Sequence, residues 1–310
     1  MVAPRRGAAC RAPTYSPPVL IVRIAVGLVL AYVVLLVLAW LFQERLAFPA
    51  PRAPLPDPTR VGVANGEQIA LVMKDGTRLA GWYLRPTTGE DGERPGRTGE
   101  VEKASPVPPR PSPSSAALLW FYGNGENIAS IWPIVREFQP PHVALLVMDY
   151  PGYSGSGGRA TEAGMYGAAD VAYAALDARP EVDPRRIYVY GRSLGTAAAT
   201  YTATHHPVAG VILESPFTNA ADMARHAYRI FPSVIVRLSL DNLGRIKQVR
   251  CPVLLFHGTA DRLVPLEMGM RIAAAARGPV ELVLLQGSGH NESYATGGTQ
   301  YRDKVWGFVR

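Results

Sequence analysis

Six short apolar segments from residue 116 onward set the strongest limit on the fold of this chain. Each ends in glycine, proline or a polar turn, and a stretch typical of a helix separates it from the next. Strands that are apolar on both faces and alternate with helices indicate a parallel sheet covered on each side. The pattern therefore predicts an α/β protein. The segments are AALLWFYG, VALLVMDYPG, RIYVYGRSLG, VAGVILESPF, CPVLLFHG and VELVLLQGSGH.

Two further strands are expected earlier, in the segment IALVMKDGTRLAGWYLRP. They are joined at Asp75-Gly76, a dipeptide that favours a tight hairpin turn. Residues 87–115 are rich in Pro, Gly, Ser, Glu and Arg and almost free of apolar side chains, so we expect a flexible insertion there. Around that insertion, residues 67–310 are predicted to form one domain.

The N-terminal region contains an apolar run, residues 19–42, that is long enough to cross a bilayer. Its single charge, Arg23, lies near its start, where the side chain reaches the headgroups. Because Arg5, Arg6 and Arg11 precede the run, the positive-inside rule puts the N-terminus in the cytoplasm and the following domain outside. A cleaved signal peptide is the alternative, but the run is longer than a signal-peptide core and no small-residue cleavage site follows it.

The N-terminal part thus divides into a cytoplasmic tail (1–18), a single-pass transmembrane anchor (19–42) and a Pro-rich spacer and lead-in (43–66). The two cysteines, Cys10 and Cys251, fall on opposite sides of the anchor, so we expect no disulfide.

The formal net charge of +7 suggests anionic partners, but the arginines are spread along the chain. That distribution is unlike the concentrated basic patch of a nucleic-acid-binding protein, so no nucleic-acid partner is expected. No phosphate-binding lysine motif and no metal-ligand cluster occurs in the sequence, so we expect neither a cofactor nor a metal.

A serine between two glycines, Gly191-Arg-Ser193-Leu-Gly195, follows the apolar segment RIYVY and precedes a helix-like segment. A strand-to-helix turn this sharp brings the backbone close to its neighbours, and side chains at the glycine positions would collide with them. Ser193 is then exposed at the carboxyl edge of the sheet, beside a helix N-terminus that favours developing negative charge. The motif predicts a nucleophilic serine.

A serine nucleophile needs a base, and the base needs an orienting carboxylate. Asp261 follows the apolar segment CPVLLFHG, and His290 follows VELVLLQG, so both belong at the same edge of the sheet as Ser193. Asp261 as a helix cap and His290 as an ordinary loop histidine are the structural alternatives. His257 is the competing base, but its place at the end of a strand indicates packing.

A tetrahedral intermediate also needs two backbone donors. The amide of Leu194, directly after the serine, is one candidate. The second is expected in the turn NGEN, where Asn124 is the first choice and Gly125 the alternate. An ordinary Gly-Asn turn is the structural alternative there.

With these residues in place, the chain resembles the α/β-hydrolase superfamily and, within it, the membrane-anchored Bem46-like serine hydrolases. The resemblance covers residues 69–310 apart from the insertion, and it implies an α/β-hydrolase fold with Ser193 as nucleophile, His290 as base and Asp261 as its orienting group. Leu194 and Asn124 would form the oxyanion hole. Relatives commonly carry His-Gly-Asn where this chain has Tyr122-Gly123-Asn124. The blocks that carry the resemblance are YGNGEN, DYPGYSGSGG, GRSLGT, LESPFTNAADMA, CPVLLFHGTADRLVP and GSGHNE.

Residues 218–250 are similar to the short cap that covers the pocket in such enzymes. Met223, Tyr228 and Phe231 are candidates for contact with an acyl chain, and core packing is the alternative. The resulting hypothesis is a membrane-anchored serine hydrolase that cleaves carboxylic esters or thioesters, of acyl or lipid-like substrates, through an acyl-enzyme.

Two other functions remain open. One is a serine peptidase of the aminopeptidase type, which would need acidic residues in the cap, where the sequence has only Asp222 and Asp241. The other is a catalytically silent scaffold, against which the complete set of three residues argues.

Overall fold

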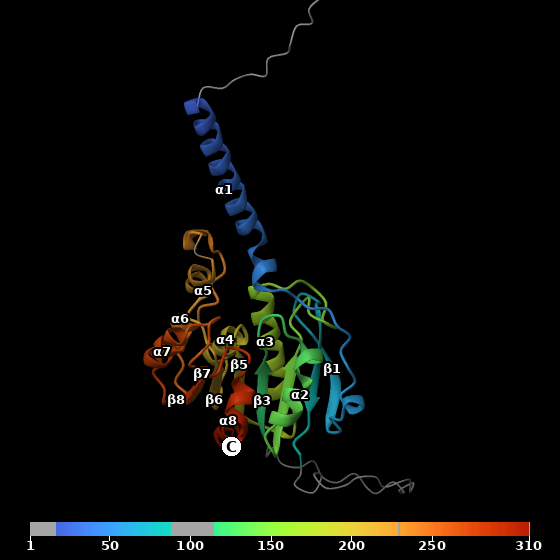
Figure 1. Cartoon of the computed structure of the whole chain (residues 1–310). Helices are drawn as coiled ribbons and strands as arrows, with labels where there is room; N and C mark the ends of the chain where they lie inside the picture. Colours follow the sequence, from blue (N-terminus) through green and yellow to red (C-terminus); the bar gives the residue numbers. More distant parts are fainter. Residues whose placement is uncertain (1–16, 88–114, 229, 310) are drawn as a thin grey trace, which may run out of the picture. The chain divides into compact units, whose positions relative to one another are not determined.

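The computed structural model describes residues 17–87, 115–228 and 230–309 (Figure 1). Most of the predicted tail and most of the predicted insertion therefore lie outside the described residues. By its internal contacts the chain divides into two compact units, residues 1–42 and residues 43–310.

Helix α1 (Pro17–Ala47) makes up the described part of the first unit, and its last turn belongs to the second. It contains the whole of the predicted anchor. Nearly all of its apolar side chains between Val19 and Phe42 are exposed, and Leu36 and Ala39 are half-buried. Among the described residues, α1 is the one helix whose length and composition would allow it to cross a membrane.

The second unit is built on one eight-stranded sheet in the order β1-β2-β4-β3-β5-β6-β7-β8. Strand β2 pairs antiparallel with β1 and with β4, and every later pair of neighbours is parallel. All six predicted apolar segments and both earlier strands are in this sheet. The strands are β1 (Gly66–Val72), β2 (Arg78–Leu84), β3 (Ser115–Phe121), β4 (Val143–Met148), β5 (Val182–Arg192), β6 (Gly210–Glu214), β7 (Val253–Gly258) and β8 (Val280–Leu285).

The hairpin between β1 and β2 forms at the predicted dipeptide. Gly76 has a φ of 85°, which glycine adopts at no steric cost. Asp75 accepts a hydrogen bond from the amide of Thr77 at 2.9 Å, and the amide of Met73 donates to the oxygen of Thr77 at 2.9 Å. The expected hairpin is therefore confirmed.

Helices cover both faces of the sheet. On one face, Gly210 of β6 lies against Phe308 of α8. Tyr188 of β5 is the residue paired with Gly210 in the sheet, so it lies on the same face. Gly191, three residues further along β5, points to the opposite face and lies against Ala199 of α4. Helix α2 joins α8, while α3, α4, α6 and α7 pack in sequence on one another. The helices are α2 (Ile128–Phe138), α3 (Glu162–Asp177), α4 (Gly195–His205), α5 (Ala220–Ala227), α6 (Asn242–Ile246), α7 (Leu266–Ala275) and α8 (Ser293–Phe308).

The Pro-rich segment 43–66 packs along this domain and does not act as a free spacer. Phe48 and Val63 are both buried in the hydrophobic core. The main-chain oxygen of Pro56 accepts hydrogen bonds from the side chains of Trp82 and Gln68, at 3.0 and 2.9 Å. The proline content indicates stiffness, but these long-range contacts decide where the segment lies.

The predicted cap, residues 218–250, divides into two parts. Helix α5 and a 3₁₀ turn (Ser233–Ile235) form the first part. Helix α6 belongs to the helical layer, because its wholly buried Asn242 donates to Thr196 at 2.9 Å and accepts from Thr200 at 2.7 Å, both on α4. We keep the name cap for residues 218–241.

Candidate active site

Ser193 lies on a sharp turn between a strand and a helix. Strand β5 ends at Arg192 and helix α4 begins at Gly195, so two residues make the turn. Ser193 has a φ of 50°, a value that residues with a side chain rarely adopt. Its amide donates to the main-chain oxygen of Glu214, at the end of β6, at 2.9 Å. This bond holds the turn at the carboxyl edge of the sheet.

The two glycines that flank Ser193 are required by close packing, as the sequence predicts. A β-carbon on Gly191 would lie 2.5 Å from the carbonyl oxygen of Gly195. A β-carbon on Gly195 would lie 2.2 Å from the carbonyl oxygen of Phe121. Neither position has room for a methyl group. The second contact also brings the start of α4 against the end of β3.

The structure brings Ser193, His290 and Asp261 together. His290 Nε2 lies 3.0 Å from Ser193 Oγ, and His290 Nδ1 lies 2.7 Å from Asp261 Oδ2. The Asp261 side chain is fully buried, and that of His290 is 10% exposed. The imidazole therefore connects the carboxylate of Asp261 to the hydroxyl group of Ser193. Ser193 itself is buried, at 7% exposure, and is not exposed at the sheet edge as expected from the sequence.

Asp261 is held in its ionised form. Burial alone would raise its pKa, but the hydrogen bond and the charge interaction with His290 and the amide of Val264 keep the pKa below the usual value. Its Oδ1 accepts from the amides of Leu263 and Val264, at 3.0 and 2.9 Å. Helix α7 begins after Pro265 without a side-chain cap, so the alternative role of Asp261 as its cap is excluded.

His257, the competing base, lies in the interior. Its side chain is wholly buried, and its Nε2 is 2.9 Å from the main-chain oxygen of Val264. Burial lowers its pKa. A β-carbon on Gly269 would lie 2.3 Å from His257 Nδ1, so helix α7 packs directly on the ring. This placement agrees with the expectation that the imidazole points into packing.

The two oxyanion candidates lie at neighbouring positions of the fold. Leu194 is buried directly before α4. Asn124 is exposed in the turn after β3, next to Gly125, which has a φ of 74°. Glu126 accepts the amide hydrogen of Gly123 at 2.6 Å, which orders the turn from the other side.

Tyr122 occupies the position where relatives commonly carry histidine, and its hydroxyl group is fully engaged. It donates to Asp149 Oδ1 and accepts from the amide of Tyr150, both at 3.0 Å. Asp149 Oδ1 also accepts the amide of Ile128 at the start of α2, at 3.0 Å. A buried network therefore supports the turn that carries Asn124.

Arg192, which the sequence reasoning missed, connects the loops of the site. It donates to Glu126, to Glu214 at 3.2 Å, to Asn291 Oδ1 at 2.7 Å and to the main-chain oxygen of His290 at 3.0 Å. Burial opposes its charge, but the carboxylates of Glu214 and Glu126 raise its pKa. Its position beside Ser193 was the available signal, whereas its partners come from distant segments.

The candidate substrate contacts differ in their surroundings. Met223 packs against the hydrophobic core, which agrees with core packing, the alternative to a substrate contact. Tyr228 is 49% exposed at the end of α5, and its ring centroid lies 6.0 Å from that of the partly buried Phe231. The cap thus presents Tyr228 on its surface.

Comparisons with known proteins agree with this architecture. The family model of the alpha/beta hydrolase fold matches residues 116–235. An esterase from Pyrococcus furiosus has the same fold, with a TM-score of 0.62 at 15% identity over 84% of this chain and 96% of that chain.

Two relatives share clear sequence similarity. An uncharacterized protein of Mycobacterium tuberculosis is 31% identical over 97% of this chain and 95% of its own length. The alpha/beta hydrolase domain-containing protein 17B of Homo sapiens is 32% identical over 69% of this chain and 73% of its own length. Similarity of this extent to a named hydrolase-domain protein goes beyond shared topology, and the chain belongs to the α/β-hydrolase family.

Proposed function

We propose that this chain is a membrane-anchored serine hydrolase that cleaves carboxylic esters or thioesters with acyl or lipid-like groups. The observation that carries the proposal is the position of His290 between Ser193 Oγ and Asp261 Oδ2, at 3.0 and 2.7 Å. Membership of the α/β-hydrolase family supports hydrolytic chemistry.

In the proposed reaction, His290 Nε2 removes the proton from Ser193 Oγ as the oxygen attacks the carbonyl carbon of the substrate. The resulting oxyanion accepts hydrogen bonds from the amides of Leu194 and Asn124. His290 then gives the proton to the leaving alcohol or thiol, and an acyl-serine remains. Water, deprotonated by the same imidazole, attacks that acyl group and releases the acid and the free serine.

The surrounding charges favour this sequence of proton transfers. The ionised Asp261 stabilises the imidazolium that forms when His290 takes the serine proton. Arg192 holds the main-chain oxygen of His290 and, through Glu126, the amide of Gly123. The base and the turn after β3 are thereby fixed relative to Ser193 before substrate binds.

The membrane part of the proposal rests on residues 19–42. This segment is apolar and helical, and α1 is long enough to span a bilayer. With Arg5, Arg6 and Arg11 on the cytoplasmic side, the domain would lie on the extracytoplasmic face. An ester with a lipid-like acyl group is the class of substrate that a membrane surface offers.

The aminopeptidase alternative is less well supported. Of the two cap-region carboxylates, Asp222 accepts hydrogen bonds from Arg225 at 2.8 Å and from Arg271 at 3.2 Å. Asp241 accepts the amide of Gly244 at 2.8 Å. Both carboxylates are engaged within the protein, so ester or thioester substrates are favoured over a peptide with a charged amino group.

The test is hydrolysis of nitrophenyl esters of increasing acyl length by the full-length protein in detergent. Ser193→Ala is expected to lower kcat by roughly 10⁵-fold or more, because it removes the nucleophile. Ser239→Ala, at an exposed serine of the cap, is the matched control and should keep full activity. Equal activity of the Ser193→Ala variant and the parent protein would refute the proposal.

A further inference from the structure

The cap carries exposed apolar side chains close together in the sequence. Tyr228 is 49% exposed, Ile230 63% and Val234 87%. Apolar side chains this open to water are costly when they gather on one short segment, and they mark an interaction surface. We call these three side chains the cap apolar surface.

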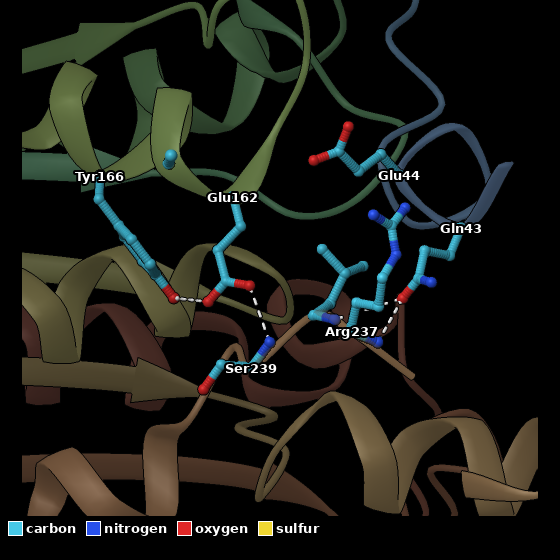
Figure 2. Close-up of a pocket in the computed structure, with 8 residues that line it drawn as sticks. Gln43, Glu44, Glu162, Tyr166, Arg237 and Ser239 are labelled. Atoms are coloured by element: carbon cyan, nitrogen blue, oxygen red, sulfur yellow. Dashed lines mark hydrogen bonds between the residues drawn. The ribbon is translucent and has the colours of Figure 1, made fainter. Parts of the chain in front are cut away.

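The cap segment that follows this surface is fastened to the residue directly after the apolar run of α1. Gln43 Oε1 accepts hydrogen bonds from the amides of Arg237 and Leu238, at 2.6 and 3.3 Å. Gln43 Nε2 donates to the main-chain oxygen of Ile235 at 3.4 Å. Figure 2 shows Gln43 pointing toward the backbone at Arg237.

A carboxylate fixes the same segment from the domain side. Glu162, at the start of α3, accepts the amide of Ser239 at 2.8 Å (Figure 2). It also accepts the amide of Leu240, at 2.7 Å. Gln43, Glu162 and Ser239 belong to the lining of a cavity of about 440 Å³. The main chain from Ile235 to Leu240 is therefore held in place at both ends.

These bonds tether the cap to Gln43, the residue that directly follows the apolar run. Gln43 directly follows Phe42, and a helix rises about 1.5 Å per residue. The headgroup zone on each side of the hydrocarbon core is roughly 5–7 Å deep. Ile235 is bonded to Gln43, and Val234 is one residue away, about 3.8 Å between Cα atoms. In a bilayer spanned by residues 19–42, Val234 would therefore be within reach of the headgroups.

The other end of the cap adjoins the candidate active site. His226 Nε2, near the end of α5, lies 3.2 Å from the main-chain oxygen of Arg262. Arg262 follows Asp261, and the next residue, Leu263, is 52% exposed. The cap is thus bonded to Gln43 at one end and to the loop that carries Asp261 at the other.

Charges around this surface suit an anionic lipid layer. Two exposed arginines follow the cap apolar surface in the sequence. Arg237 is three residues after Val234, and the main-chain oxygen of Arg262 lies 3.2 Å from His226 Nε2 at the end of α5. Segments that lie in a membrane interface combine apolar side chains, which enter the headgroup boundary, with cations that meet lipid phosphates. The same combination is less typical of a surface that remains in water.

We propose that the cap apolar surface docks on the outer leaflet of the bilayer, with Tyr228, Ile230 and Val234 at the boundary of headgroups and acyl chains. Acyl substrates would then pass from the lipid to Ser193 without crossing water. The inference rests on the proposed membrane anchoring and the proposed ester hydrolysis, and it adds the partner surface and the route of the substrate.

Fluorescence quenching tests the depth of the cap in full-length protein reconstituted into phosphatidylcholine–phosphatidylglycerol vesicles. In a background with Cys10→Ser and Cys251→Ala, an environment-sensitive dye is attached to Val234→Cys. The matched control is Val72→Cys, at a 60% exposed valine of β1, and Val33→Cys labels the apolar run. Brominated lipid should quench the dye at positions 234 and 33 about twofold or more and leave position 72 unchanged.

The possible outcomes distinguish a failure of cap docking from a failure of the membrane anchoring or of the proposed hydrolysis. Quenching at position 33 without quenching at position 234 overturns cap docking alone. Absence of quenching at position 33 overturns the membrane anchoring and cap docking with it. Hydrolysis by Ser193→Ala at the parent rate overturns the hydrolase proposal and the substrate route, whereas the depth of the cap is decided by the quenching alone.

A kinetic experiment tests the route of the substrate. Val234→Ser should lower the rate on a long-chain ester embedded in vesicles about three- to tenfold and leave the rate on a water-soluble short-chain ester unchanged. Val72→Ser should change neither rate. Unchanged rates on both substrates in Val234→Ser, or an equal loss on both, would overturn delivery from the bilayer.

Discussion

Arg192 Nη2 lies 3.0 Å from the main-chain oxygen of His290 and donates a hydrogen bond to it. The residue before the candidate nucleophile thus holds the loop that carries the candidate base. Because the same guanidinium also binds Glu214 and Glu126, three segments that are distant in the sequence meet at one buried cation.

Arg192→Met is expected to destabilise the fold by about 3–5 kcal/mol, because it leaves the fully buried Glu214 carboxylate without its cation. Denaturant unfolding measures the loss. Arg185→Met is the control, since that arginine is exposed and pairs with Asp183 at the surface. A loss equal to that of the control would contradict a structural role for the buried cation.

Asn291→Ala removes one acceptor of Arg192, at 2.7 Å, beside the main-chain bond to His290. We expect kcat to fall several-fold with little change in KM, because the loop of the base loses part of its support. Restoration by Asn291→Asp, which keeps an acceptor oxygen, would support positioning. An unchanged kcat in Asn291→Ala would show that the main-chain bond is sufficient.

Asp261→Asn is expected to lower kcat by about 10⁴-fold, since an amide cannot stabilise the imidazolium or fix the tautomer of His290. His257→Gln removes the competing imidazole and should leave kcat within about tenfold of the parent value. Steady-state kinetics on a short-chain ester measures kcat for both variants and shows which of the two residues the reaction requires. The opposite ranking of the two variants would reassign the base.

Asp149→Asn is expected to change the pH dependence of stability. Burial raises the pKa of Asp149 to about 6. A carboxyl group with a raised folded pKa binds protons more tightly in the folded state, so its stabilising contribution is full below about pH 4 and is lost as the pH rises through about 6. Asparagine does not titrate and keeps an acceptor for Tyr122 and Ile128.

The free energy of unfolding of Asp149→Asn, relative to the parent protein, should therefore increase between about pH 4 and pH 7, by on the order of 2–3 kcal/mol. Denaturant titrations across this range measure the difference. A difference that stays constant with pH would mean that Asp149 titrates alike in the folded and unfolded chain.

Gln43→Ala should release the cap segment that it binds. The amides of Arg237 and Leu238 lose their acceptor, and each such bond contributes about 1 kcal/mol, so hydrogen exchange there should accelerate roughly fivefold. Glu44→Ala, at the adjacent residue, is the control and should leave these amides unchanged. Equal exchange in the two variants would show that Glu162 alone holds the segment.

The strand pattern could be predicted because it depends on local sequence. Each apolar segment is long enough for one strand and ends at its own turn, and parallel strands carry their carboxyl ends to one edge. Asp261 and His290 follow β7 and β8, which are neighbours in the sheet, and so they meet. The close packing at Gly191 and Gly195 could also be predicted, because the strand, the turn and the helix around them are adjacent in the sequence.

The remaining features depend on contacts that no local pattern contains. Glu126, Glu214 and Asn291 look like ordinary polar residues until the fold brings them to Arg192. The segment 43–66 looked like a spacer because proline dominates it, although Phe48 joins the core. The predicted cap included α6, which belongs to the helical layer. The buried hydrogen bonds between α6 and α4 could not be recognised from the sequence.

The close packing at Gly195 has a consequence for how enzymes of this kind diversify. A single added methyl group there meets a carbonyl oxygen, so the turn that carries Ser193 accepts almost no substitution. The exposed side chains of the cap, Ile230 and Val234 among them, meet no such restriction. Over evolutionary time, mutation is therefore free to alter the surface that the cap presents while the turn at Ser193 stays constant.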